Sequence, residues 1–420
     1  MERFLINGGR SLHGETRVNG AKNAVLPILA ACLLSNEETV LHRVPRLADV
    51  SAMCQVLEAC GGSVCWQGDS LVIKPAIMAE PHIPEDLIKK MRASNLILGP
   101  LLCRLGSISL PFPGGCCIGP RPMNYHISAF RQLGAAISDE GSYIRANSKN
   151  MKGKEVCLDF PSVGATENIM MAAAGIPGRT LIRNAAREPE IVDLAIFLQK
   201  MGARISGAGS DMIFIEGSKD LHGAEHEIMA DRIEAGTLLI AAAITCGDVL
   251  LQNYDGCYLA ALIAKMKEAG VEISQELGGL RARGLGRPRR VHIRTMPYPG
   301  FPTDMQPQFM ALTTLAEGTS IIEENIFENR FRHVDEMRRL GAEIQALGSE
   351  AAVVTGRPSL SGAPVEVSDL RAGAALVLMG LAAQGQTTVE KICYIDRGYE
   401  RMEDTLTALG GDIKRVECGE

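Results

Sequence analysis

The sequence repeats one short phrase six times, and this repeat limits the folds that the chain can adopt. The phrase runs from an apolar or small residue through a glycine and two further residues to Ile or Val, as in Leu133-Gly134-Ala135-Ala136-Ile137. Its glycines are Gly61, Gly134, Gly202, Gly270, Gly341 and Gly410. Successive glycines lie 73, 68, 68, 71 and 69 residues apart, a period too regular for chance recurrence even in a Gly- and Ala-rich chain.

The residues around each glycine predict how a repeat folds. An amphipathic helix pattern precedes the glycine, as at residues 191–201, and a β-rich run follows it, as at residues 212–215. A glycine at this place suits the left-handed position that ends a helix, because it has no Cβ. We therefore expect each of the six glycines to terminate a helix.

A second helical series is offset from the first. Its segments are rich in Ala, Leu, Met and small residues, and they cover residues 21–34, 93–105, 165–174, 234–246, 305–317 and 372–384. Helices that are apolar on all sides are buried. Each repeat of about seventy residues thus holds two helices and several strands, which is too little for an ordinary domain.

The repeats predict an α/β fold of two similar domains. Because one repeat cannot enclose a core, we expect three repeats to surround a shared core of buried helices, and this arrangement to occur twice with a cleft between the domains. A chain of 420 residues with 46% hydrophobic residues has enough apolar mass for two cores.

Charge and cysteine usage exclude several classes of function. The formal net charge of −6 gives no positive field for nucleic-acid binding. The basic run at residues 281–290 has turn composition, which favours a solvated loop. The 12 cysteines show neither a CxxC pair nor Cys/His ligand spacing, so we expect reduced thiols and no metal site. Most are expected to be inert core residues, among them Cys32, Cys54, Cys60, Cys103 and Cys246.

The chain shows no targeting or membrane segment. Its first residues lack a signal-peptide pattern, and uncharged runs such as residues 372–385 fall short of the ~18 residues of a spanning helix. We expect a cytoplasmic protein. Nucleotide-hydrolase and metalloprotease motifs are also missing, since Gly153-Lys154 is followed by Glu155 and there is no HExxH.

Cations stand at the starts of helices, where the helix dipole disfavours them. Those of the buried series are Lys22 (next to Asn23), Arg92 and Arg371, and those ahead of amphipathic helices are Arg121, Arg330 and Arg397. Their repeated occurrence suggests that an anionic ligand compensates them. The alternative is ordinary solvated arginine. Asp369 and Asp396 each lie close to such an arginine, and the ordinary interpretation of these pairs is mutual neutralisation.

Two further residues are candidates for acid–base chemistry. Cys116 lies in a loop rich in Gly and Pro at residues 113–122, five residues before Arg121, which suits a reactive thiol. Asp304 stands at the start of a buried helix. It is either a helix cap or a general base that faces the cleft.

These residues fall within motifs of a known family. The motifs, in chain order, are Asn19–Ala24, Arg92–Ser94, Pro113–Cys116 with Arg121–Pro122, Ser162–Thr166, Pro299–Gln306, Glu328–Phe331, Ser368–Arg371 and Ile395–Glu400. Through them the chain resembles, nearly end to end, the UDP-N-acetylglucosamine 1-carboxyvinyltransferase family of bacterial peptidoglycan synthesis.

The resemblance implies a pair of inside-out α/β domains, each with three copies of one folding unit. Residues 22–229 would form the first domain, which carries the Cys116 loop, and residues 1–21 with 230–420 the second. The active site would lie in the cleft between them. A monomer is expected, with neither a metal nor an organic cofactor.

The resemblance also implies a reaction and the residues that perform it. The enolpyruvyl group of phosphoenolpyruvate would move to the 3′-hydroxyl of UDP-N-acetylglucosamine, with release of phosphate by addition and elimination. Cys116 would donate the proton, attach covalently to phosphoenolpyruvate and be the target of fosfomycin, while Asp304 would be the base. Lys22, Arg121 and Arg397 would hold phosphoenolpyruvate, supported by Arg330 and Arg371.

For the nucleotide sugar the resemblance implies a second group of residues. Those near the sugar and the uridine would be Asn23, Arg92, Arg121, Pro122, Met123, Asn124 and Tyr125. Ser162, Val163 and Gly164 would lie near the diphosphate, and Ile326 would line the site, with Asp369 and Asp304 also binding substrate.

The sequence departs from the family pattern at two positions. Cys117 adds a second thiol beside Cys116. Phe160 stands where some members have a lysine, so the diphosphate contact there is expected from the backbone or from elsewhere.

Three alternatives are open at the level of sequence. The related enolpyruvyl transferase that acts on shikimate 3-phosphate lacks the Gly-Gly-Cys loop. A ring-like clamp without catalysis is expected to have a basic inner face. The third alternative is a regulatory paralogue that keeps the nucleotide-sugar site but turns over slowly.

Overall fold

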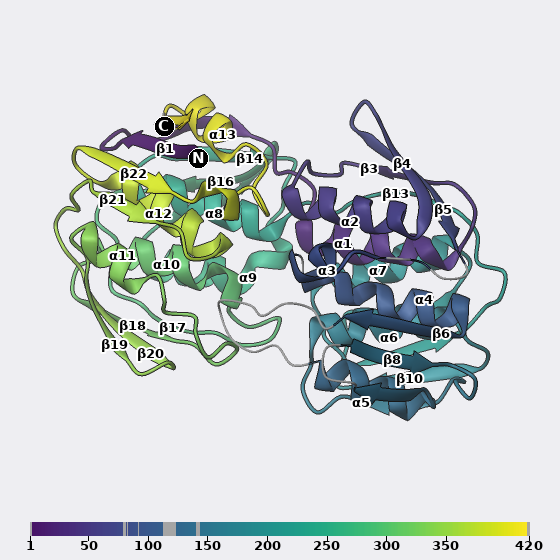
Figure 1. Ribbon diagram of the computed structural model, residues 1–420. Coiled ribbons are helices and arrows are strands. Elements are labelled where there is room, and N and C mark those ends of the chain that lie inside the picture. The colour runs from purple at the N-terminus through teal and green to yellow at the C-terminus, as the bar shows by residue number, and fades with distance from the viewer. Residues whose placement is uncertain are drawn as a thin grey trace. The chain divides into compact units, whose positions relative to one another are not determined.

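The computed structural model describes residues 2–78, 81, 83–90, 92–111, 123–139 and 143–417. These residues divide into two compact units, and each is described by itself. The described part of residues 20–229 is the central unit. Residues 2–19 with 230–417 form the terminal unit, which is built from both ends of the chain. Figure 1 labels many of the helices and strands of both units.

The central unit contains three repeats of helices and a sheet. Its buried helices are α1 (Lys22–Ala31), α4 (Leu98–Leu105) and α6 (Val163–Gly175). Its amphipathic helices are α2 (Ala48–Ala59), α5 (Asn124–Leu133) and α7 (Pro189–Lys200). Its short helices are η1 (Cys32–Leu34), α3 (Glu85–Lys90) and η2 (Arg92–Ile97).

The strands of the central unit form three sheets. The strands are β3 (Thr39–His42), β4 (Gly61–Gln67), β5 (Ser70–Ile77), β6 (Ser107–Pro111), β7 (Ala136–Asp139), β8 (Tyr143–Asn147), β9 (Glu155–Cys157), β10 (Arg179–Arg183), β11 (Arg204–Ser206), β12 (Met212–Glu216) and β13 (Glu225–Glu227). The strand orders are β13-β3-β5-β4, β6-β8-β7 and β9-β10-β12-β11.

The terminal unit repeats this plan. Its buried helices are α8 (Arg232–Ile244), α10 (Gln306–Thr313) and α12 (Leu370–Ala382). Its amphipathic helices are α9 (Ala260–Glu268), α11 (Val334–Arg339) and α13 (Met402–Ala408). Its 3₁₀ helices are η3 (Cys257–Leu259), η4 (Thr303–Met305) and η5 (Ile392–Tyr394).

Three sheets also belong to the terminal unit. Their strands are β1 (Glu2–Asn7), β2 (His13–Thr16), β14 (Asp248–Gln252), β15 (Glu272–Glu276), β16 (Gly279–Arg283), β17 (His292–Arg294), β18 (Thr319–Glu323), β19 (Glu343–Leu347), β20 (Ala351–Thr355), β21 (Pro364–Glu366), β22 (Gln386–Glu390) and β23 (Asp412–Glu417). The strand orders are β2-β14-β16-β15, β17-β18-β20-β19 and β21-β22-β1-β23.

Five of the six sheets in the described residues share one pairing pattern. An edge strand pairs in parallel with its neighbour, and the next two pairings are antiparallel, as in β9-β10-β12-β11. The sheet β6-β8-β7 has the two antiparallel pairings only, among the residues that the structure describes. One folding unit therefore recurs along the chain, as the repeat predicts.

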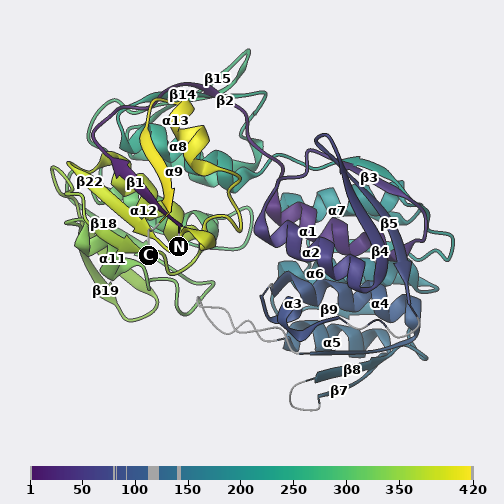
Figure 2. The same ribbon diagram turned by 45° about the horizontal axis from the view of Figure 1, so that its top comes forward.

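The two ends of the chain meet in one sheet of the terminal unit. Strand β1 lies between β22 and β23 and is antiparallel to both, with Phe4 opposite Val389 on one side and Arg415 on the other. The first strand of the chain thus completes its last sheet, and Figure 2 shows these strands side by side.

Helices fill the interior of each unit and sheets cover it. All 13 residues of α8 are buried, and α12 is buried from Arg371 to Leu381. In the terminal unit α8, α10 and α12 pack on one another inside the sheets (Figure 1). The expected α/β fold with buried helices is confirmed. Within the described part of the chain, every helix is too short or too polar to cross a lipid bilayer.

The six repeat glycines adopt the expected left-handed backbone. Their φ angles range from 88° at Gly341 to 113° at Gly61. A residue with a Cβ would be strained there, which explains why the repeat keeps a glycine at this position.

Two of the expected buried helices are shorter than predicted. The segment 93–105 begins as the 3₁₀ helix η2, and α4 starts only at Leu98. In the segment 305–317, α10 ends at Thr313, where the hydroxyls of Thr313 and Thr314 donate to backbone carbonyls of the last turn.

The described cysteines are free thiols, and most of the expected core cysteines are shielded from solvent. Burial raises the pKa of Cys32, Cys54, Cys60 and Cys103 to about 12, which makes these thiols unreactive. The prediction for Cys246 is wrong. This residue follows the end of α8 with a φ of 51° and is exposed.

Candidate functional site

In the terminal unit, Asp304 is held by two buried arginines. Oδ2 of Asp304 accepts a hydrogen bond of 2.8 Å from Nη2 of Arg371, and Oδ1 accepts one of 3.4 Å from Nη2 of Arg330. The arginine side chains are 5% and 1% exposed, whereas the Asp304 side chain is 25% exposed. The site thus offers a partly accessible carboxylate on a buried cationic support.

Asp304 does not cap the helix that it precedes. It lies within η4, and the N-cap residues, Pro302 of η4 and Met305 of α10, make no side-chain capping hydrogen bond. Asp369 is the residue that caps a buried helix here. Its Oδ1 accepts the backbone N–H groups of Arg371 and Ala372 at the start of α12 and lies 3.7 Å from Nη1 of Arg330.

The charges of this cluster stabilise one another. Although burial disfavours the charged form of Arg371, the Asp304 carboxylate raises the pKa of this guanidinium overall. Burial, with the nearby charge of Arg330, lowers the pKa of His333 to about 4, so this imidazole is neutral at pH 7. Nε of Arg330 and Nη1 of Arg371 are buried and have no hydrogen-bond partner among the described residues.

The acid–base pairs expected from the sequence are arranged differently in space. The Asp369 carboxylate binds the backbone of Arg371, while the Arg371 guanidinium binds Asp304. The Asp396 carboxylate binds Arg415, at 2.6 and 3.1 Å, and not the adjacent Arg397. The expectation of mutual neutralisation is therefore wrong for both pairs, because the side chains of close neighbours in sequence point to different partners. Arg397 is half-buried and lies between η5 and α13.

A polar network joins the buried helices behind Arg371. The Tyr399 hydroxyl lies 2.9 Å from Oγ1 of Thr237 on α8 and accepts a hydrogen bond of 3.2 Å from Nε2 of Gln308 on α10. The Arg371 guanidinium lies 5.8 Å from the centre of the Tyr399 ring, within the range of a cation–π contact. The network joins α8 and α10 to Tyr399, and the ring of Tyr399 contacts Arg371 of α12.

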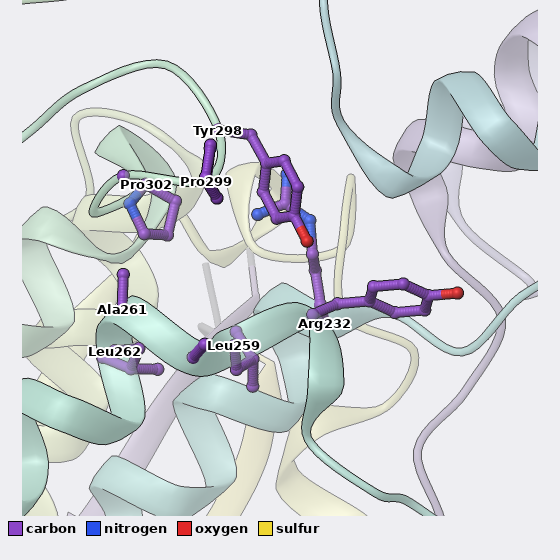
Figure 3. A pocket seen from close by; sticks show the side chains of 10 residues that line it. Arg232, Leu259, Ala261, Leu262, Tyr298, Pro299 and Pro302 are labelled. Carbon is purple, nitrogen blue, oxygen red and sulfur yellow. The ribbon is translucent and has the colours of Figure 1, made fainter. Parts of the chain in front are cut away.

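A shallow hollow lies next to the segment that leads to Asp304. Pro302, Pro299 and Tyr298 form one side and Leu259 the other, with Arg232 between them (Figure 3). The Arg232 guanidinium lies 5.7 Å from the centre of the Tyr298 ring.

In the central unit, Lys22 has a protein carboxylate as partner. Lys22 is the first residue of α1, and its Nζ lies 2.8 Å from Oδ2 of Asp49 in the first turn of α2. Both side chains are largely buried, at 12% and 7% exposed. The charge at this helix start is thus balanced at least in part by Asp49, a residue that sequence reasoning missed. Asn23 follows Lys22 on α1 and is half-buried.

Several residues expected near the nucleotide lie together at the starts of α5 and α6. Met123 precedes α5, while Asn124 and Tyr125 begin it. The Tyr125 ring stacks on Phe160, with centroids 6.2 Å apart and an interplanar angle of 26°.

The start of α6 follows directly after this aromatic pair. Ser162 caps α6 by accepting the backbone N–H of Ala165, and Val163 and Gly164 form the first turn. A Cβ at Gly164 would lie 3.4 Å from the His126 ring, so α6 begins in close contact with α5 here. At position 160, the Phe160 ring packs on Tyr125. A lysine at this position would instead place a positive charge beside the start of α6.

The structure does not describe some of the residues that were predicted to form the site. Cys116, Cys117, Arg121 and Pro122 lie outside the described residues. Arg92 is the first residue of η2. Among the residues that the structure describes, no three His, Cys, Asp or Glu side chains lie close enough together to hold a metal ion.

Comparison with known proteins identifies the family. A model of the family described as EPSP synthase (3-phosphoshikimate 1-carboxyvinyltransferase) matches residues 6–406. The chain is 51% identical over 413 residues to UDP-N-acetylglucosamine 1-carboxyvinyltransferase 1 of Caldanaerobacter subterraneus subsp. tengcongensis, covering 98% of this chain and 99% of the relative. It is 52% identical over 416 residues to the protein of that name from Carboxydothermus hydrogenoformans, covering 99% of each. The chain belongs to the UDP-N-acetylglucosamine 1-carboxyvinyltransferase family.

Members of this family are transferases, and solved structures agree with its fold. The enolpyruvyl transferase NikO from Streptomyces tendae superimposes with a TM-score of 0.88 at 22% identity, over 100% of this chain and 99% of that one. EPSP synthase from Acinetobacter baumannii gives a TM-score of 0.73 at 17% identity, over 99% and 100%. At these identities the likeness concerns the fold alone. The high identity to the carboxyvinyltransferases separates this chain from the shikimate 3-phosphate enzyme.

Proposed function

We propose that this protein transfers the enolpyruvyl group of phosphoenolpyruvate to the 3′-hydroxyl of UDP-N-acetylglucosamine and releases phosphate, as the first committed step of peptidoglycan synthesis. The observation that carries this proposal is the identity of 51% and 52% to relatives of that name over nearly their whole length. The ion-paired Asp304 carboxylate supports it, because the reaction needs a positioned base.

The proposed reaction has an addition step and an elimination step. In the addition, the acceptor hydroxyl oxygen bonds to C2 of phosphoenolpyruvate, Asp304 takes the hydroxyl proton and the Cys116 thiol gives a proton to C3. In the elimination, the bond from C2 to the phosphate oxygen breaks with the proton of Asp304 going to the departing phosphate, and the Cys116 thiolate takes a proton back from C3, which restores the double bond. Atoms and charges balance without a metal or an organic cofactor.

Cationic side chains are proposed to bind the charged groups of phosphoenolpyruvate. Lys22, Arg121 and Arg397 would hold its phosphate and carboxylate, and Arg330 and Arg371 would support them. The pairing of Arg330 and Arg371 with Asp304 supports this role, since it places fixed positive charge beside the proposed base.

The nucleotide sugar is proposed to bind along the starts of helices. The residues are Asn23, Arg92, Arg121, Pro122, Met123, Asn124, Tyr125, Ser162, Val163, Gly164, Ile326 and Asp369. The packing of Tyr125 on Phe160 beside the start of α6 supports this grouping. The backbone N–H groups at a helix start favour the binding of a diphosphate. At the start of α6 they would replace the contact that a lysine at position 160 makes in some family members.

The proposal also includes the reactions of the Cys116 thiol, the oligomeric state and the cellular location of the protein. Cys116 would be alkylated by fosfomycin and would form an adduct with phosphoenolpyruvate. The protein would act as a monomer in the cytoplasm, where its substrates are made.

Mass spectrometry of the product tests the reaction. Incubation of the purified protein with phosphoenolpyruvate and UDP-N-acetylglucosamine is expected to give one new nucleotide that is heavier than the acceptor by an enolpyruvyl group. Recovery of unchanged UDP-N-acetylglucosamine, with the enolpyruvyl group on shikimate 3-phosphate in the parallel reaction, would contradict the proposal.

A further inference from the structure

A buried carboxylate that the proposed reaction does not use lies close to Asp304. Glu324 directly follows β18, and the residue is 2% exposed. Burial raises the pKa of its carboxyl group, although the N–H of Ile326 and the charge of Arg330 oppose that rise. A buried acid needs compensating hydrogen bonds, and the partners of Glu324 indicate what it does.

The Glu324 carboxylate connects two separate segments of the terminal unit. From its own loop it accepts the backbone N–H groups of Ile326 and Phe327 at 2.9 and 3.2 Å. From the η4 segment it accepts the Thr303 hydroxyl, which lies 3.1 Å from Oε1 and 3.0 Å from Oε2. One side chain thus links the loop that leads to Arg330 with the residue that precedes Asp304.

Thr303 is held from two sides as a result. Its hydroxyl binds Glu324, and its carbonyl oxygen accepts a hydrogen bond of 3.1 Å from Nη2 of Arg330. The same Nη2 atom donates to Oδ1 of Asp304. Glu324, Thr303, Arg330 and Asp304 therefore form one continuous network.

We propose that Glu324 is a positioning residue, which fixes Thr303 and thereby holds the Asp304 carboxylate at the place where it accepts a proton. This inference rests on the proposed function, in which Asp304 is the base. A base that is displaced by about 1 Å can lose about a hundredfold in rate, so a fixed η4 turn matters for kcat. The link through the Thr303 hydroxyl is distinct from the two bonds that Glu324 makes within its own loop.

Matched variants of Thr303 separate positioning from loop stability. Thr303→Val keeps the shape of the side chain but removes the hydroxyl, and it leaves the bonds of Glu324 to Ile326 and Phe327 intact. Thr303→Ser keeps the hydroxyl and is the control. We expect kcat to fall by about ten- to a hundredfold in Thr303→Val and to stay within about threefold of wild type in Thr303→Ser.

Further kinetic readouts distinguish the link from a general structural effect. The KM for UDP-N-acetylglucosamine is expected to change by less than about threefold in both Thr303 variants, since the hydroxyl does not bind substrate in this proposal. Adding Glu324→Leu to Thr303→Val is expected to lower kcat by much less than Glu324→Leu lowers it in wild type, because each change removes the hydrogen bond between Thr303 and Glu324. Equal kcat in Thr303→Val and Thr303→Ser, or independent losses in the double variant, would overturn the proposal.

Crystal structures of the two Thr303 variants give a readout that does not depend on turnover. We expect the Asp304 carboxylate to lose its 2.8 Å contact with Arg371 in Thr303→Val and to keep it in Thr303→Ser. An unchanged contact in Thr303→Val would refute positioning by Glu324, even in an active enzyme. A wild-type protein that forms no product would instead refute the proposed function, and the two structures would still decide whether Glu324 fixes Asp304.

Discussion

Nη2 of Arg371 donates a hydrogen bond of 2.8 Å to Oδ2 of Asp304, and it joins the start of α12 to the turn before α10. The Arg371 side chain is 5% exposed and that of Asp304 is 25% exposed, so the carboxylate is the more accessible partner. A carboxylate that is held in this way keeps a fixed direction and can still meet a substrate. This relationship underlies the first prediction.

Removing the base is expected to stop turnover. We predict that Asp304→Ala and Asp304→Asn lose at least about a hundredfold in kcat, because the proposed reaction assigns Asp304 as the base for the acceptor hydroxyl. Asp304→Asn keeps the shape and a hydrogen-bond acceptor next to Arg371, but both variants leave the buried guanidinium without its negative partner, which lowers stability. Phosphate release and the thermal unfolding midpoint measure the two effects separately. Near-normal turnover in either variant would show that Asp304 is structural.

The thiol is expected to be replaceable by another acid. We predict that Cys116→Asp keeps much of the activity, since a carboxylic acid can still donate a proton, and that it becomes insensitive to fosfomycin. Cys117→Ser is the matched control and should keep both activity and sensitivity. Full sensitivity of Cys116→Asp, measured as loss of phosphate release after exposure to the drug, would assign the reactive thiol to Cys117.

The polar network behind Arg371 is expected to contribute to stability. Tyr399→Phe removes the hydroxyl that meets Thr237 and leaves the Gln308 amide with one partner fewer in the core. We predict that the free energy of unfolding falls by about 1–2 kcal/mol, the usual cost of such a loss. Chemical denaturation of both proteins measures the change, and equal midpoints with equal slopes would contradict the assignment.

Glu234 is expected to make stability depend on pH. Burial raises the pKa of its carboxyl group to about 8 from 4.5, although the backbone and side-chain N–H groups of Asn19 both donate to it at 2.9 Å. The folded protein therefore binds this proton more tightly than the unfolded chain. Its stabilising effect is complete below pH 4.5 and is lost as the pH rises through about 8.

Glu234→Gln removes this titration and provides the test. Relative to the variant, wild type should lose unfolding free energy between pH 5 and pH 8, as denaturation at several pH values would show. A stability difference that stays constant over this range would mean that the Asn19 bonds, rather than burial, determine the charge of Glu234.

The six-fold repeat in the sequence predicted much of the fold. The left-handed glycines and the buried Ala- and Leu-rich helices are local features, so one stretch of sequence contains the cause of each. The helix ends were less predictable, as at Thr313 and Thr314, where side-chain hydroxyls compete for the backbone carbonyls of the last turn.

The candidate site was predictable only where it follows motifs. The motifs point to Asp304, Arg330 and Arg371, which the structure brings together. Asp49 and Glu324 were missed, because each acts through a partner that lies in another segment of the chain and no local pattern marks it. The predicted pairing of Asp396 with Arg397 was wrong for the same reason, since its partner Arg415 lies on β23, in another segment of the chain.

Phosphate release from phosphoenolpyruvate is the measurement that tests the central claim most directly. It is measured with UDP-N-acetylglucosamine or shikimate 3-phosphate as the acceptor, before and after exposure to fosfomycin. The account predicts release with the nucleotide sugar alone and its loss after the drug. Release with shikimate 3-phosphate, or no release with either acceptor, would contradict it.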